Sequence, residues 1–214
     1  VHSGSRVMGQ HIAAFHGRRA TTVGNGLAWL AADDENGRTY LHDVAWARAY
    51  AAESRRRMLV AAAEVASDIL SVSPNWATLL NTDHNHIQQE RHGDQTLWVH
   101  RKGANLADAG VANIIPGSMV THTYHVEGRG APAALASSSH GAGRRLSRSA
   151  ARARIRRKDL ERQLAQVWID PYAAARLVDE APAAYKDIDA VMRAQRDLVR
   201  IVRRLRPILC FKGV

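Results

Sequence analysis

The order of its periodic segments constrains the fold of this chain more than any other feature. Residues 43–70 are rich in alanine and repeat larger apolar side chains at helical spacing. Residues 97–99 and 120–126 have the composition and alternation of strands. Residues 145–166 and 185–205 again follow a helical pattern. Because helices and strands do not alternate and no internal repeat is present, the sequence predicts an α+β fold with a mixed sheet and long flanking helices.

Local signals set the expected boundaries of these elements. Asp43 is a suitable N-cap for the first long helix, and Ser71 with Ser73-Pro74 marks its end. Pro207 is expected to stop the last helix. A chain of 214 residues is long enough to bury a sizeable core. Since no linker divides it, we predict a single domain over residues 1–214.

The charge of the chain favours a polyanionic partner. Its net charge is +10, and eight Arg or Lys residues lie between Arg144 and Lys158 without an acid among them. Cations that neutralise phosphates give affinity that does not depend on sequence. An arginine bias that serves only as a solvated surface explains the composition equally well, because only four of the thirty cations are Lys.

Cysteine content and hydropathy indicate the compartment. Cys210 is the only cysteine, so no intrachain disulfide can form and a reducing environment is expected. No segment approaches the roughly 18 apolar residues that span a bilayer. We therefore expect a cytoplasmic protein.

The stretch Ser139-His140-Gly141-Ala142-Gly143-Arg144 carries the clearest chemical signal. Glycines let a backbone approach a ligand without a Cβ clash, and successive N–H groups in such a turn bind anions. A neutral imidazole at this place can attack phosphorus. An ordinary loop histidine is the alternative that the residues alone leave open. Ser137, Ser138 and Ser139 are expected to be loop residues.

The same stretch resembles the signature of the RtcB family of RNA ligases. Six further blocks resemble blocks of that family and occur in the same order. They are Val1-His2-Ser3-Gly4-Ser5-Arg6, His84-Asn85, His100-Arg101-Lys102-Gly103-Ala104, Ile114-Ile115-Pro116-Gly117-Ser118-Met119, Ala184-Tyr185-Lys186-Asp187-Ile188-Asp189 and Phe211-Lys212-Gly213. The resemblance therefore extends from one end of the chain to the other.

The resemblance implies an RNA ligase that depends on GTP and Mn²⁺. In such an enzyme His140 displaces pyrophosphate from GTP and carries GMP. GMP then passes to the 3'-phosphate of an RNA, and a 5'-hydroxyl end is joined to this activated end. An RNA with a 2',3'-cyclic phosphate end is also a substrate. His2 and His84 match metal-ligand positions, and imidazole suits Mn²⁺. The RNA substrate belongs to tRNA splicing or to RNA repair.

Eleven residues are implied to bind the nucleotide. They are Asn85, Pro116, Gly117, Ser118, Met119, Thr123, Gly141, Ala142, Gly143, Tyr185 and Lys212. Tyr185 and Lys212 are expected to border the guanine, so that an ammonium facing O6 would favour GTP over ATP. Arg101 and Lys102 are expected to face RNA or phosphate. We assign no metal to His86 and no catalytic role to Asp187 or Asp189. Cys210 is expected to be a small buried residue.

Departures from the family pattern leave other functions open. An aspartate, a cysteine and a histidine of the family's metal site belong to an N-terminal half that this chain lacks. We therefore interpret it as the C-terminal part of an RtcB-like fold, which we expect to be inactive alone. Val7, Val120 and His125 also depart from the pattern. The alternatives are an inactive RNA- or nucleotide-binding remnant and a metal-dependent phosphoesterase. A helper protein and the oligomeric state are not predicted.

Overall fold

The computed structural model describes residues 1–174 and 176–212, and it divides the chain into two compact units. The first unit consists of Val1–Glu90 and Thr96–His100, and the second of Arg91–Gln95 and Arg101–Val214. Helices and small, mostly antiparallel sheets make up both, so the predicted α+β class is confirmed. That the units form a single domain stays a prediction.

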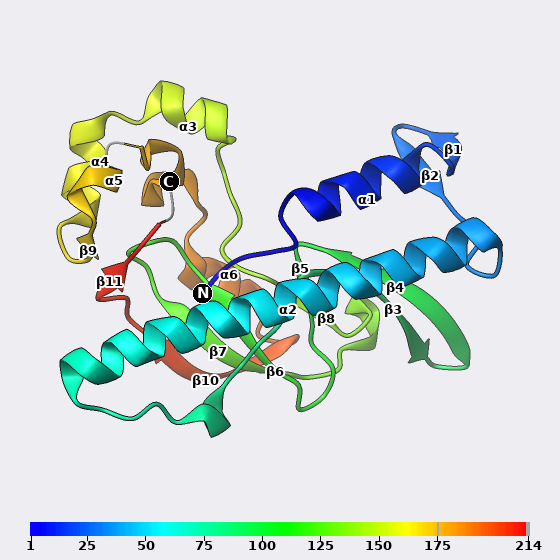
Figure 1. The fold of residues 1–214 in the computed structure, drawn as a ribbon, viewed down its shortest axis with the longest axis horizontal. Helices are drawn as coiled ribbons and strands as arrows, with labels where there is room; N and C mark the ends of the chain where they lie inside the picture. Colours follow the sequence, from blue (N-terminus) through cyan, green and yellow to red (C-terminus); the bar gives the residue numbers. More distant parts are fainter. Residues whose placement is uncertain (175, 213–214) are drawn as a thin grey trace. The chain divides into compact units, whose positions relative to one another are not determined.

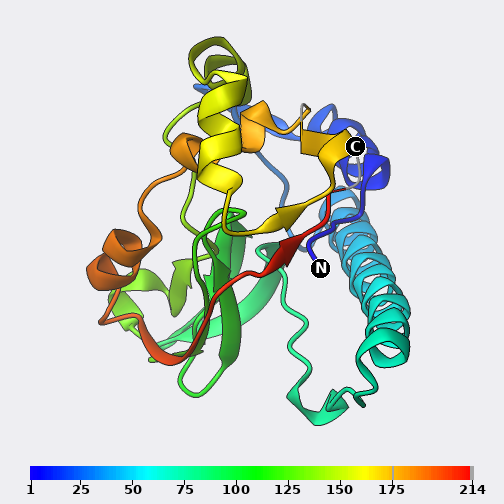
Figure 2. The same cartoon turned by 90° about the vertical axis from the view of Figure 1, so that its left-hand side faces the viewer.

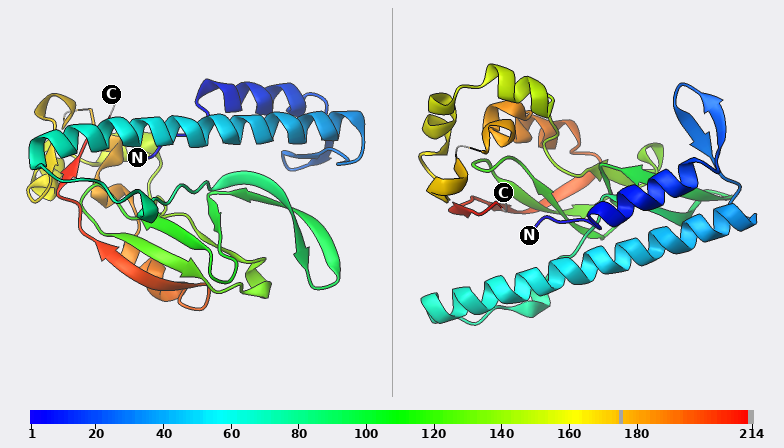
Figure 3. Two further views of the ribbon diagram at one scale, coloured as in Figure 1. Left: turned by 60° about the horizontal axis from the view of Figure 1, so that its bottom comes forward. Right: turned by 45° about the horizontal axis from the view of Figure 1, so that its top comes forward.

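Two helices dominate the first unit. Helix α1 (Val7–Gly17) lies alongside the first half of the 36-residue helix α2 (Glu35–Leu70), as Figure 3 shows. The buried His16 on α1 contacts Asp43 on α2 at 2.8 Å between Nε2 and Oδ2. Between the helices, β1 (Thr21–Gly24) and β2 (Leu27–Trp29) form an antiparallel hairpin. The short η1 (Trp76–Thr78) follows α2.

The start of α2 differs from the expectation. The N-cap is Asp34, whose carboxylate accepts a hydrogen bond from the Gly37 amide at 2.6 Å. Asp43 lies inside the helix and contacts His16 instead, so the prediction of Asp43 as N-cap was wrong. The expected end is confirmed, because Ser71 adopts a left-handed conformation with φ of 53°.

Strands β3 (Asn85–His92) and β4 (Gln95–Lys102) pair with each other in a two-stranded sheet, whose residues are shared between the units. The predicted strand at residues 97–99 is thus the middle of a longer one.

Two sheets organise the second unit (Figure 1). Strand β5 (Ala104–Leu106) pairs antiparallel with β8 (Ser137–Ser139), so the three serines form a strand and the prediction of a loop was wrong. Strands β6 (Ala112–Pro116), β7 (Thr123–Gly128) and β10 (Val199–Leu205) form an antiparallel sheet in the order β10-β7-β6. The strand expected at residues 120–126 begins at Thr123.

The helix predicted over residues 185–205 is wrong in its second half. Helix α6 (Ile188–Ala194) is capped by Asp187 and ends at Gln195. Residues 199–205 form β10 instead. The apolar positions of this segment fit both periods. Pairing with β7, more than 70 residues away in sequence, supplies the backbone hydrogen bonds that select the strand.

The basic segment forms two helices where a single one was predicted. Helix α3 (Arg148–Arg154) is capped by Ser147, and α4 (Arg157–Leu164) starts after an extended Arg156. Ile155 is extended at the break and packs against the same core as Leu160 and Leu164. Burial of these apolar side chains outweighs continued helical hydrogen bonding.

Two clusters of buried side chains stabilise the second unit. The strand core joins β6 and β7 to α6; it contains Ala107, Ile115, Tyr124, Val126, Ala142, Ile188, Met192 and Val199. The helical core lies around α4; it contains Met119, Leu160, Leu164, Ala173, Leu177 and Ala181.

Short elements complete the second unit. Strand β9 (Trp168–Ile169) pairs in parallel with β11 (Leu209–Cys210), as Figure 2 shows. The remaining elements are α5 (Pro171–Ala174), η2 (Pro132–Ala134), η3 (Val178–Glu180) and η4 (Pro182–Ala184). Within residues 1–174 and 176–212, every helix is too short or too polar to span a bilayer.

Candidate functional site

The register of β5 and β8 positions His140. Ala104 lies opposite Ser139 in the antiparallel register. Gly103 and His140 are therefore neighbours at the same end of the two paired strands. His140 Nδ1 lies 2.6 Å from the Gly103 carbonyl oxygen. Gly103 has φ of +71°, and a Cβ there would lie 3.3 Å from His140 Cε1. Glycine is therefore required both by the backbone conformation and by the close approach of the ring.

This contact determines the tautomer of the imidazole. A carbonyl oxygen only accepts, so Nδ1 donates and carries the proton. In the neutral ring Nε2 then holds the lone pair, which is the form that attacks an electrophile. His140 is half-buried. The Gly103 carbonyl therefore orients the ring, and the role of His140 as a nucleophile stays a prediction.

The loop after β6 packs against the His140 loop. The Ala142 amide donates to the Pro116 carbonyl at 2.9 Å, and a Cβ on Gly141 would lie 2.9 Å from the same oxygen. A Cβ on Gly117 would lie 2.2 Å from Thr121 Oγ1, so glycine is required there too. The structure thus brings the two predicted nucleotide-binding segments together in one unit.

The other members of these segments have varied surroundings. The Ser118 amide donates to Thr121 Oγ1 at 2.6 Å, and the two hydroxyls are 3.0 Å apart. Thr123 lies opposite Pro116 in the β6–β7 register. Met119 is 6% exposed and belongs to the helical core, and its predicted contact with a nucleotide stays a prediction. Ala142 is buried in the strand core.

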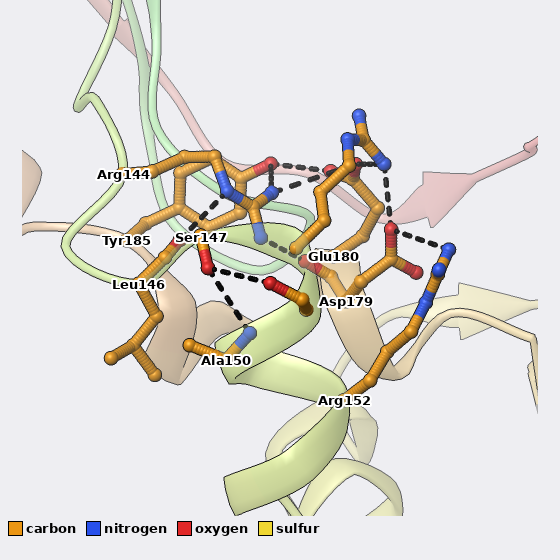
Figure 4. A network of polar contacts seen from close by, with 10 residues as sticks. Arg144, Leu146, Ser147, Ala150, Arg152, Asp179, Glu180 and Tyr185 are labelled. Atoms are coloured by element: carbon orange, nitrogen blue, oxygen red, sulfur yellow. Dashed lines mark hydrogen bonds and ion pairs between the residues drawn. The ribbon is translucent and has the colours of Figure 1, made fainter.

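A polar network lies behind the glycine turn (Figure 4). The Lys186 amide donates to the Gly143 carbonyl at 2.9 Å. Arg144 Nη1 donates to the Tyr185 hydroxyl at 3.1 Å, and its guanidinium carbon lies 5.0 Å from the centre of the tyrosine ring. The Tyr185 hydroxyl donates to the carboxylate of Glu180. Burial, and then this bond, raise the pKa of Tyr185 to about 12, so the phenol stays protonated.

Two acids at the end of η3 pair with α3. Asp179 is 3% exposed and accepts from Arg148 Nη1 at 2.7 Å and from Arg152 Nη2 at 3.2 Å. Burial by itself raises the pKa of Asp179, but the bond from Arg148 and the charge of Arg152 outweigh it, and the net shift is downward. Glu180 lies 2.6 Å from Arg148. Our sequence interpretation missed both acids. Their negative charge, opposite to that of the basic segment, was the feature that could have indicated the pairing.

Arg101 does not face solvent, so the expectation that it faces RNA was wrong, whereas Lys102 is exposed and its role toward RNA or phosphate stays a prediction. It is 3% exposed. Its guanidinium donates to Ser137 Oγ at 2.9 Å and to the Leu135 carbonyl at 2.8 Å. Leu135 and Ala136 both have φ of 45°, an uncommon conformation for residues other than glycine. Arg101 therefore stabilises the strained approach to β8.

Lys212 follows β11, whose pairing with β9 holds this end of the chain in the second unit. It is half-buried, and its position beside a guanine stays a prediction.

Gly143 has φ of +71°, which suits glycine. Cys210 is half-buried, and burial raises the pKa of its thiol. This shift is typical of a structural cysteine.

The two predicted metal ligands meet in the first unit. His2 Nε2 and His84 Nε2 are 3.2 Å apart, and the rings stack at 12° with centroids 5.5 Å apart. Two nitrogens bound to one metal at about 2.1 Å lie roughly 3.0 to 3.4 Å apart. The pair therefore fits a shared cation. In the part of the chain that the structure describes, no group of three or more His, Cys, Asp or Glu side chains is arranged to hold a metal, and the role of these two imidazoles as ligands stays a prediction.

Arginines of α2 hold the segments that carry these histidines. Arg55 Nε donates to Asn81 Oδ1 at 2.8 Å, and its Nη1 donates to the Ser3 carbonyl at 3.1 Å. Arg48 Nε donates to Asp83 at 2.8 Å. One side chain of the arginine triplet at residues 55–57 thus bridges the two histidine segments. The other two pair with Glu53 at the surface.

His86 belongs to the same region without joining the imidazole pair. It is 3% exposed, and its Nδ1 lies 2.7 Å from Asp83 Oδ1. Burial opposes ionisation of Asp83, but the bonds from His86 and Arg48 outweigh it and lower its pKa to about 2. Asn85 is exposed at the first position of β3, next to His84. Its role toward a nucleotide stays a prediction.

Comparison with known proteins identifies the family. The family model described as "tRNA-splicing ligase RtcB" matches residues 1–213. The chain is 37% identical to the RNA-splicing ligase RtcB of Escherichia coli (strain K12) over 227 residues, covering all of this chain and 55% of that protein. It is 32% identical over 243 residues to the RNA-splicing ligase RtcB of Mycobacterium tuberculosis (strain ATCC 25618 / H37Rv), covering 100% and 56%.

A third relative is the tRNA-splicing ligase RtcB of Pyrococcus furiosus (strain ATCC 43587 / DSM 3638 / JCM 8422 / Vc1). It is 31% identical over 250 residues, covering all of this chain and 26% of that protein. The chain spans about half the length of its bacterial relatives. The chain therefore belongs to the RtcB family.

Proposed function

We propose that the natural protein containing this chain is an RNA ligase that joins RNA 3'-phosphate or 2',3'-cyclic phosphate ends to 5'-hydroxyl ends. GTP is its second substrate, and Mn²⁺ its metal. The observation that carries the proposal is His140, held by the Gly103 carbonyl with Nε2 as the nucleophilic nitrogen, in a chain that the family model matches over residues 1–213. The names of the curated relatives support an RNA substrate. We extend the proposal to an RtcB-like fold for both units.

In the first step, Nε2 of His140 forms a bond to the α-phosphorus of GTP. The bond between that phosphorus and the oxygen bridging to the β-phosphate breaks, and pyrophosphate leaves. The Gly103 carbonyl stabilises the positive charge that develops on the ring as it attacks. An oxygen of the RNA 3'-phosphate then displaces His140 from the phosphorus. Finally the 5'-hydroxyl attacks the activated 3'-phosphate, and GMP leaves.

Other residues of the chain bind and orient the substrates. The loop of Gly117 and Ser118 contacts the His140 loop through Pro116, so a nucleotide near His140 meets both. Tyr185, whose hydroxyl is held by Arg144 and Glu180, offers its ring to the base. His2 and His84 fit a manganese ion. When bound, this ion would neutralise phosphate charge and align the groups that attack and leave.

The test is covalent labelling with α-labelled GTP in the presence of Mn²⁺. We expect the natural protein to acquire an acid-labile label, whereas residues 1–214 by themselves should label poorly, because they offer two of the metal ligands. The His140→Ala variant should acquire none, because it lacks the attacking nitrogen. A matched control is His125→Ala, which removes another half-buried histidine of the same unit from β7 and should leave labelling intact. Persistence of the label in His140→Ala would refute the assignment. Phosphate-ester hydrolysis without GTP would indicate a phosphoesterase, and RNA binding without either reaction a remnant.

A further inference from the structure

Gln195 is a buried polar side chain that the proposed reaction does not use. It ends α6 and is 6% exposed. Both polar atoms of its carboxamide contact Ser139, the residue before His140. The Ser139 amide donates to Oε1 at 2.9 Å, and Nε2 donates to Ser139 Oγ at 3.1 Å. A buried amide that contacts one residue at two points fixes both its position and its orientation.

The direction of these bonds is determined by their chemistry. The backbone N–H of Ser139 can only donate, so Oε1 must face it and Nε2 must face the hydroxyl. Since Ser139 Oγ accepts from Nε2, its own proton is directed elsewhere. It donates to the Gly141 carbonyl at 3.1 Å. The bonds therefore run from Gln195 through Ser139 to Gly141 and span His140.

His140 is thus held from both sides along the chain. Ser139 is fixed by Gln195, and the segment after His140 is fixed by the bond from the Ala142 amide to the Pro116 carbonyl at 2.9 Å. The ring, in turn, is oriented by the Gly103 carbonyl at 2.6 Å. The position of the imidazole ring matters for the rate, because a displacement of a catalytic group by about 1 Å can lower the rate by about 100-fold.

We propose that Gln195 is a positioning residue for His140: its carboxamide fixes Ser139 and thereby keeps the imidazole Nδ1 on the Gly103 carbonyl, so that Nε2 is the nitrogen without the proton. This inference rests on the proposed function for its catalytic consequence. Its structural part, the tautomer of His140, does not depend on GTP, metal or RNA.

Only glutamine satisfies this place. Asparagine is one methylene shorter. Methionine has a similar length, but its thioether is only a weak acceptor for the Ser139 amide and cannot donate to the hydroxyl. Glutamate accepts at both oxygens, so the Ser139 hydroxyl would turn toward it and leave the Gly141 carbonyl. Glutamate would also bury a carboxylate, because residue 195 is only 6% exposed. The carboxylate would lie next to the Met192 sulfur, which is now 3.3 Å from the Gln195 amide nitrogen.

The experiment measures the imidazole ¹⁵N chemical shifts of His140, which distinguish a proton on Nδ1 from one on Nε2. We expect the wild-type chain to hold the neutral ring as the Nδ1–H form. Gln195→Met should move a large part of the population to the other tautomer. Gln195→Glu and Ser139→Ala, which keep an acceptor for the residue 139 amide, should have smaller effects. In the labelling assay, Gln195→Met should slow GMP attachment by about 10- to 100-fold.

A matched control separates positioning from stability. Gln163 Oε1 accepts from the Ala183 amide at 3.1 Å, so Gln163→Met removes a glutamine–backbone bond of the same kind elsewhere in the unit. It should lower the unfolding temperature as Gln195→Met does while leaving the His140 tautomer unchanged. An unchanged tautomer and labelling rate in Gln195→Met would overturn the inference.

Two further outcomes are informative. If Gln195→Met does not fold, Ser139→Ala decides, because it removes the hydroxyl bridge and leaves Gln195 in place. We expect a smaller but measurable shift of the His140 tautomer in this variant, and no shift at all would overturn the inference. A tautomer that shifts with Gln195 in a protein that GTP never labels would leave the positioning role standing and reject the proposed function.

Discussion

Helix α2 and the sheet of the second unit are stabilised in different ways. Only Gly37, Ala47 and Ala51 are buried among the 36 residues of α2, and all three lie in its first half. Apolar side chains near its end are exposed, including Val65 at 58% and Ile69 at 75%. By contrast, β6, β7 and α6 share a core in which Ile115 is fully buried and Val126 is 1% exposed.

This difference separates local from tertiary stabilisation. The second half of α2 is stabilised by helix propensity and by surface ion pairs such as Glu53 with Arg56, and it buries few side chains. Isolated helical segments of this kind are marginal in water. Strand β7 lies between two partners and buries alternate side chains, so its opening requires disruption of the core. His140, the proposed nucleophile, belongs to this more constrained unit.

Amide hydrogen exchange tests the comparison with the largest expected effect. We expect amides of residues 52–70 to exchange at least about 100-fold faster than those of β7, because local opening of the helix end exposes them without disrupting a core. Mass spectrometry of peptides from the two segments measures this. Equal protection would show that another element covers the exposed face of α2.

Replacement of Asp179 sharpens the second half of the comparison. Asp179→Asn keeps the shape but weakens the charge-assisted bonds from Arg148 and Arg152, so it should lower the free energy of unfolding by about 1.5 to 3 kcal/mol at pH 7. Asp197→Asn is the control, since Asp197 is 89% exposed and 3.9 Å from Arg196. Its effect should be close to zero. Equal effects would contradict an important role for the buried acid.

The same variant has a defined pH dependence. The folded-state pKa of Asp179 is lowered, so its stabilising contribution is present above the unfolded value of about 3.9 and is lost as pH falls through the folded value. The difference in unfolding free energy between wild type and Asp179→Asn should therefore shrink on acidification below about pH 4. Denaturant titrations at several pH values measure it. A difference in unfolding free energy that grows as the pH falls would contradict a lowered pKa of Asp179 in the folded state.

The smallest expected effect concerns the basic surface. Arg148 and Arg152 pair with Asp179, whereas no ion pair of the described residues involves Arg145 or Arg154. If this surface follows an RNA backbone, Arg145→Ala should reduce the slope of log affinity against log salt by roughly 0.7 to 0.9. Arg148→Ala should reduce it less, because its charge already faces a carboxylate. Equal slopes for wild type and all single variants would favour a solvated surface.

Local signals in the sequence were sufficient for several features. The long helix ends at Ser71 as expected, because a left-handed residue before Pro74 stops it. The order of the motif blocks indicated the family, which the match over residues 1–213 confirms. The α+β class followed from the order of periodic segments. The proximity of His2 and His84 also agreed with the expectation, although their role as ligands stays a prediction.

Tertiary structure alone decided the rest. Residues 199–205 satisfy both a helical and a strand pattern, and pairing with β7 selects the strand. The basic segment divides at Ile155 because apolar burial competes with helix continuity. Gln195 contacts Ser139 across 56 residues. The sequence by itself determined the local elements, the chemical groups and their order; which groups meet depended on long-range burial and hydrogen bonding, because such energies come from partners that no local window contains.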